Sequence, residues 1–107
     1  NDNYYLITRE GDTFKALGKE IEISWRKLAK YNERDKNDVL HRGEVIYLKK
    51  KRKKAPKQYK NRPHIVRNSE SMYTISQKYG IRLKYLYKMN NFDVDHQIKI
   101  GDRIRIR

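Results

Sequence analysis

The chain has 107 residues, of which 36% are hydrophobic and 37% are charged, and its mean hydropathy is −1.13. It has no cysteine, which excludes a disulfide framework and a thiolate metal site, and it contains no apolar run of the roughly 18 residues that would cross a membrane. The net charge of +14 suggests nucleic-acid binding, so the position of the charge along the chain matters.

The first predicted elements are a strand and a helix. Residues 4–8 form a short run rich in aromatic and β-branched side chains, which is typical of a strand. Asp12 or Thr13 then caps a helix whose apolar residues, from Phe14 to Ile21, follow at spacings of three and four. This spacing places them on one face, so the helix is predicted to cover a core.

A second short helix and a closing strand follow. The helix begins after Ser24, with Trp25 expected in the core, and ends at Asn32, whose short amide side chain can bond local backbone. Gly43 then turns the chain into a strand over residues 45–48. The first 48 residues therefore predict the order strand, helix, helix, strand.

The next segment, residues 49–62, carries most of the excess charge. It holds nine basic residues and no acidic residue, whereas residues 1–48 hold nine of each and residues 63–107 hold nine basic and four acidic residues. Because a run of like charges repels itself, we predict a solvated, extended linker. The charge thus belongs mainly to one short segment rather than to a folded basic face.

The remainder repeats the first part at an offset of 58 residues. Identical residues meet at seven pairs of positions, namely Ile23 and Ile81, Leu28 and Leu86, Lys30 and Lys88, Asn32 and Asn90, Asp35 and Asp93, Gly43 and Gly101, and Ile46 and Ile104. Near the N-terminus the best hydrophobic match has an offset of 59, which aligns Ile7 with Val66. The first copy is therefore expected to have one extra residue before Gly11.

The repeat predicts an α+β fold of two small βααβ modules. An antiparallel pair of strands with two helices on one face is the simplest arrangement that buries the apolar faces of each unit. We predict a first module over residues 1–48, a basic linker over 49–62 and a second module over 63–107. Gly80 is expected to end the first helix of the second module.

Catalytic and metal-binding patterns are not apparent in the sequence. Glu20 and Glu22 lie two residues apart on a predicted helix and so fall on different faces. Asp93, Asp95 and His96 form a weak metal-like cluster that is better read as a solvated loop. We therefore expect a non-catalytic chain with no cofactor and no metal.

Taken together, the segments YLITREGDTFKAL and VLHRGEVIYL, with a Leu and an Asn at helical spacing between them, resemble the LysM pattern. The resemblance covers about 45 residues in each copy. It implies binding of N-acetylglucosamine-containing glycans, which are peptidoglycan in bacteria and chitin in many eukaryotic examples. Because many eukaryotic LysM proteins carry disulfides, the absence of cysteine favours a bacterial peptidoglycan binder.

In the family, the sugar lies in a shallow groove between the strand-to-helix turn and the loop before the last strand. In the first copy the resemblance assigns Gly11, Asp12, Thr13 and Phe14 to the turn and Leu40, His41 and Arg42 to the loop. In the second copy it assigns Ser69, Glu70, Ser71 and Met72, with Tyr73 beside them, and the loop residues Ile98, Lys99 and Ile100. Ser69 replaces the usual glycine, and it would be strained if the turn needs a positive φ.

The resemblance implies a part of a larger exported protein, such as a cell-wall hydrolase, that is held in the bacterial periplasm or cell envelope as a monomer without membrane insertion. An alternative function is nucleic-acid or anionic-polymer binding through the basic linker. A third is that the modules only pack against a neighbouring domain. Binding through charge would weaken with salt, whereas binding in a sugar groove would be nearly indifferent to it.

Overall fold

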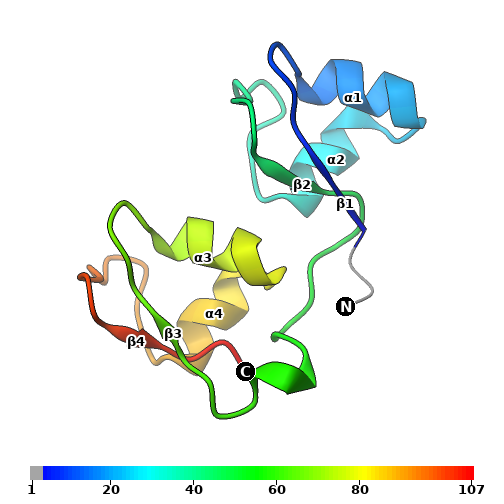
Figure 1. Ribbon diagram of the computed structural model, residues 1–107. Coiled ribbons are helices and arrows are strands. Elements are labelled where there is room, and N and C mark those ends of the chain that lie inside the picture. Colours follow the sequence, from blue (N-terminus) through cyan, green and yellow to red (C-terminus); the bar gives the residue numbers. More distant parts are fainter. Residues whose placement is uncertain (1–3) are drawn as a thin grey trace. The chain divides into compact units, whose positions relative to one another are not determined.

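The computed structural model describes residues 4–107, so residues 1–3 of the expected first module lie outside the described residues (Figure 1). The chain divides after Lys51 into two compact units, and the second extends from Arg52 to Arg107. Each unit contains a two-stranded antiparallel sheet and two α-helices, which confirms the predicted α+β fold of two βααβ modules. Within the described residues, no helix is long and apolar enough to cross a membrane.

The first module runs β1 (Tyr5–Ile7), α1 (Phe14–Ile21), α2 (Trp25–Tyr31) and β2 (Val45–Tyr47). The Thr13 hydroxyl caps α1 by accepting a hydrogen bond from the backbone N–H of Ala16 at 3.0 Å. The core of the module consists of Phe14, Leu17, Leu28, Ala29, Leu40 and Ile46, which are all buried. These residues come from both helices, the loop and β2, as the spacing predicts.

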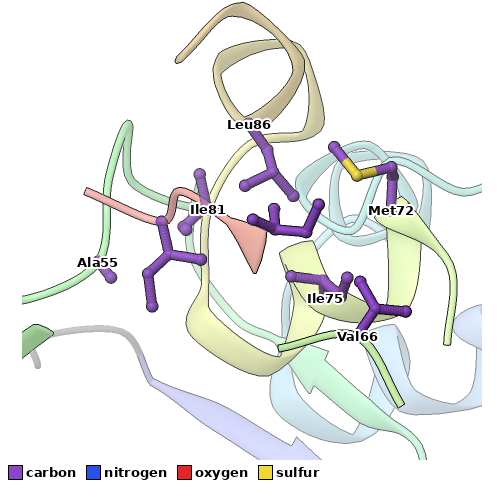
Figure 2. Packing of buried hydrophobic residues seen from close by; sticks show 8 residues of the cluster. Ala55, Val66, Met72, Ile75, Ile81 and Leu86 are labelled. Carbon is purple, nitrogen blue, oxygen red and sulfur yellow. The ribbon is translucent and has the colours of Figure 1, made fainter. Parts of the chain in front are cut away.

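The second module runs β3 (His64–Ile65), α3 (Met72–Tyr79), α4 (Leu83–Met89) and β4 (Arg103–Ile104). Ser71 and Thr74 form a capping box at the start of α3. Gly80 ends the helix with a φ of 68°, which confirms the predicted stop. Figure 2 shows the core of this module, in which the labelled side chains of α3 and α4, Met72, Ile75 and Leu86, lie with those of Ala55, Val66 and Ile81.

The strand register shows that the expected extra residue before Gly11 was a wrong prediction. Leu6 pairs with Ile46 and His64 pairs with Ile104, so the offset of 58 holds through the first strands. A slip of one residue exchanges the two faces of a strand. Hydrophobic matching misled the alignment because polar residues occupy two inward positions: His64 corresponds to Leu6, and buried Thr8 corresponds to Val66. Thr8 is satisfied there, since its hydroxyl donates to the carbonyl of His41.

The segment expected as a solvated linker is largely folded onto the second module. Ala55 is fully buried in the core, its N–H donates to the carbonyl of Ile106 at 2.7 Å, and its carbonyl accepts from Arg107 at 2.8 Å (Figure 2). Arg52 forms a parallel bridge with Ile81. A 3₁₀ turn, η1 (Lys57–Tyr59), then brings Tyr59 edge-on to Tyr79 with ring centroids 5.2 Å apart.

Candidate functional site

A groove of about 430 Å³ opens in the first module between the β1–α1 turn and the loop before β2. It is lined by Gly11, Asp12, Thr13, Lys15, Trp25, Lys36, Asn37, Asp38, Val39 and Leu40. Four of the seven expected residues, Gly11, Asp12, Thr13 and Leu40, therefore line one cavity. Phe14 lies in the core instead, and His41 and Arg42 are exposed on the loop beyond the lining residues.

The turn that forms one wall is held by its own side chains. Gly11 adopts a φ of 83°, which favours glycine. One carboxylate oxygen of Asp12 accepts from the backbone N–H of Arg9 at 2.7 Å, and Arg9 also donates to Glu20 at 2.9 Å. The backbone hydrogen bond from Arg9 lowers the pKa of Asp12. Asp12 is thus engaged in shaping the turn.

The opposite wall is braced by Arg34, which the sequence did not single out. Its guanidinium donates to Asp38 and to Glu44, both at 2.8 Å, and to the carbonyl of Val39 at 3.1 Å. The repeat gave no signal for this brace, because position 92 of the second module holds Phe92 in place of arginine. There Phe92 stacks on His96, with centroids 3.7 Å apart, so the two loops are held by different chemistry.

Asn32 bonds local backbone as expected, and both Asn32 and its equivalent Asn90 also bond backbone fifteen residues further along the chain. The Asn32 side chain donates to the carbonyls of Leu28 and Tyr47 at 2.9 Å each and accepts from the N–H of Tyr47 at 2.7 Å. Asn90 makes the same three bonds to Leu86 and Arg105. Asn32 therefore joins α2 to β2, and Asn90 joins α4 to the residue that follows β4.

Trp25 lies at the groove, although sequence reasoning placed it in the core. Its half-buried ring packs partly on the core and partly lines the groove, with Arg26 and Lys36 over the ring at 5.3 and 5.4 Å from its centroid. The sequence pattern of an apolar residue at the start of a helix is the same whether its side chain lies in a core or lines a groove. The difference comes from the loop of residues 36–40, which reaches the ring only in the folded chain.

The corresponding turn of the second module has the same shape with different residues. Ser69 adopts a φ of 66°, and Ser71 caps α3. A carboxylate oxygen of Glu70 accepts from the N–H of Arg67 at 2.7 Å and contacts His64 Nε2 at 2.8 Å. His64 Nδ1 lies 2.7 Å from the Tyr79 hydroxyl. The inward His64 is thus satisfied by a chain of polar groups that begins in the turn.

The other expected residues of this module are dispersed. Met72 is buried in the core, Ile98 packs against it, and Tyr73 is half-buried. Ile100 is 70% exposed, and the backbone N–H of Lys99 donates to Asp102. Leu83 occupies the position that corresponds to Trp25, so the aromatic wall belongs to the first module.

Comparison with known families assigns both modules. The LysM domain family matches residues 7–49 and residues 64–107. The chain belongs to the LysM domain family. This assignment agrees with the tandem repeat, and LysM domains are binding domains that generally recognise N-acetylglucosamine-containing glycans.

Two solved structures are similar to the tandem LysM chain over nearly its whole length. The spore cortex-lytic enzyme SleL of Bacillus cereus is 21% identical over 98% of this chain and 22% of that chain, with a TM-score of 0.41. SleL of Bacillus megaterium QM B1551 is 18% identical over 97% of this chain and 22% of that chain, with a TM-score of 0.40. The chain therefore spans about a fifth of their length. No curated protein matches it in sequence.

Ser69 carries backbone strain in the second LysM module, and replacing it by glycine is expected to stabilise the module. Left-handed backbone costs a non-glycine residue about 1–2 kcal/mol, which exceeds the entropy that glycine adds to the unfolded chain, so the net gain is about 0.5–1 kcal/mol. Gly11→Ser should lower the stability of the first module by a similar amount. Chemical denaturation of both variants measures these changes, and a loss in Ser69→Gly would contradict the strained geometry.

The LysM modules are expected to lose stability in acid. Burial raises the pKa of Glu44, but hydrogen bonds from His41 and Arg34 lower it overall. Burial likewise raises the pKa of Glu70, and hydrogen bonds from His64 and Arg67 lower it overall. A folded-state pKa below the unfolded value stabilises the fold above that value, and this contribution disappears as the pH falls below about 4.5. Thermal unfolding measured from about pH 7 to pH 3 should show the decline. Glu44→Gln and Glu70→Gln should flatten it.

Proposed function

We propose that this chain binds peptidoglycan through the groove of the first LysM module and anchors a larger protein to it. The observation that carries the proposal is the groove itself, in which a glycine turn, the apolar side chains of Val39 and Leu40 and the Trp25 ring meet. A sugar acetamide needs backbone polar partners and an apolar wall for its methyl group, and the groove offers both. The ring of Trp25 adds a flat face of the kind that pyranose C–H groups contact.

The second module is proposed to bind the same polymer more weakly. Its turn has the same geometry, but Leu83 stands where the first module has Trp25. Two weak sites on one chain strengthen each other when both engage the same polymer, because the second contact is then intramolecular. The chain would thus be retained on an extended glycan better than on a short fragment. We propose that it acts as a monomer in the bacterial cell envelope.

Replacing Trp25 by Leu tests the aromatic wall. Leucine is the residue of the second module at this position, so it preserves apolar packing while it removes the ring. We expect retention on purified peptidoglycan to fall about tenfold, which corresponds to the loss of roughly 1.4 kcal/mol of binding free energy. The reciprocal change, Leu83→Trp, should increase retention. Both variants are compared with the unmodified chain on peptidoglycan and on chitin, at low and at high salt.

The outcomes separate the candidate functions. Salt-resistant retention that falls in Trp25→Leu supports the groove, and the preferred polymer identifies the ligand. Retention that is lost at high salt but unchanged in Trp25→Leu would show that charge is the binder. Absence of retention on both polymers would leave the modules as packing units for a neighbouring domain. Thermal unfolding of each variant excludes a simple loss of fold.

A further inference from the structure

The second module has a basic face that lies apart from its turn. Lys53, from the folded linker, meets Arg82, Lys84 and Tyr85 at the start of α4, and Lys88 follows one turn later. Three of these cations lie over the Tyr85 ring, with Lys53, Arg82 and Lys84 at 5.4, 4.7 and 5.2 Å from its centroid. Within the described residues, none of the three forms an ion pair with an acidic side chain.

The charge of the whole unit is strongly one-sided. Residues 52–107 contain fifteen Lys and Arg residues and four Asp and Glu residues, so this module carries most of the net charge of the chain. Its acidic residues are Glu70, Asp93, Asp95 and Asp102, which all lie on the two loops that flank the proposed glycan site. Neither the folded linker nor α4 contains an acidic residue. Like charges are therefore held together without local compensation, which costs stability unless an anion is bound.

We propose that the face formed by Lys53, Arg82, Lys84 and Tyr85 binds a linear phosphodiester polymer that carries no bases. A polymer with one full charge per repeat offers the charge density that neighbouring ammonium and guanidinium groups require. Proteins that bind single-stranded nucleic acid present open aromatic faces on which bases stack. Three cations lie over the Tyr85 ring, against two over Trp25, and this concentration of charge favours a ligand that is recognised mainly through its phosphates. The field of the same cations lowers the pKa of Tyr85 against the opposing effect of burial.

Two double variants with equal charge test this site. Lys53→Gln with Lys84→Gln removes two cations from the Tyr85 face, whereas Lys57→Gln with Lys60→Gln removes two exposed cations of the same module that do not lie over this ring. Binding of fluorescein-labelled poly(glycerol phosphate) is followed by anisotropy between about 50 and 200 mM salt. We expect the first variant to bind about tenfold more weakly and to lower the slope of log affinity against log salt by about 1.5, and the second to lose less than about threefold.

Two further variants and two further probes complete the test. Tyr85→Leu keeps every charge and should bind about threefold more weakly, whereas Tyr85→Phe should match the unmodified chain. Equal losses in the two double variants would show diffuse attraction and overturn the site. Tighter binding of oligo(dT) or of poly(glutamate) at matched charge would overturn the assignment to a phosphodiester polymer without bases. The probe contains no N-acetylglucosamine, so failure here is distinct from failure of the proposed glycan groove.

Discussion

Replacing Asn32 by alanine is expected to unfold the first LysM module while the second remains folded. Asn32 is fully buried and makes three hydrogen bonds, two of them to the backbone of β2. Its removal leaves the carbonyl and N–H of Tyr47 without these bonds in the interior, and we expect a loss of about 2–4 kcal/mol. A module of about 50 residues has a small margin of stability, so a loss of this size takes most of it.

The measurement uses the single tryptophan of the chain. Trp25 lies in the first module, so its fluorescence follows the unfolding of that module alone. Asn32→Asp serves as a second variant, because it retains the acceptor for Tyr47 and loses the donors, and it should fall between alanine and the unmodified chain. Asn37→Ala, at an exposed position, should leave the transition within about 0.5 kcal/mol. A transition unchanged in Asn32→Ala would contradict the structural role of the asparagine.

The second large effect is expected at Ala55, in the segment whose sequence reads as a charged linker. Ala55→Glu places a carboxylate at a fully buried position in the apolar core of the second module, and we expect a loss of about 3 kcal/mol or more. Lys54→Gln changes the charge by the same amount at an exposed neighbour and should be nearly neutral.

Hydrogen exchange of the backbone amides reports each module separately in these variants. Amides of α3 and α4 should lose protection in Ala55→Glu, while those of α1 and α2 keep it. If Ala55→Glu and Lys54→Gln behaved alike, the segment would be a spacer and not a part of the module. The LysM family match to the second module begins at residue 64, whereas the compact unit begins at Arg52. This experiment therefore also tests where the second folding unit starts.

Helical periodicity, end caps and the repeat predicted the fold because they are local or periodic signals. The spacing from Phe14 to Ile21, the cap at Thr13 and the stop at Gly80 each depend on a few neighbouring residues. The strand alignment failed because His64 occupies a core position. Its ring nitrogens contact Tyr79 and Glu70, which are 15 and 6 residues away, and hydrophobic matching does not score such polar contacts.

Two further features escaped the sequence because they depend on tertiary contacts. Trp25 forms a wall only when the loop of residues 36–40 faces it, and Arg34 braces that loop through partners up to ten residues away. In the basic segment of residues 49–62, the nine cations led us to predict a solvated linker. Ala55 and Tyr59 of this segment nevertheless pack in or against the core of the second module. The assigned glycan residues remain a prediction, supported by the four that line one groove.

The difference between Leu6 and His64 at equivalent strand positions also affects how the chain folds. Tandem repeats are prone to exchange strands between neighbouring copies during folding. Placing β3 in the first module would bury a histidine away from Glu70 and Tyr79, and placing β1 in the second would leave both of those polar groups without their ring partner. Each strand therefore fits its own module better than the other module. The difference between Leu6 and His64 thus disfavours strand exchange between the two modules during folding.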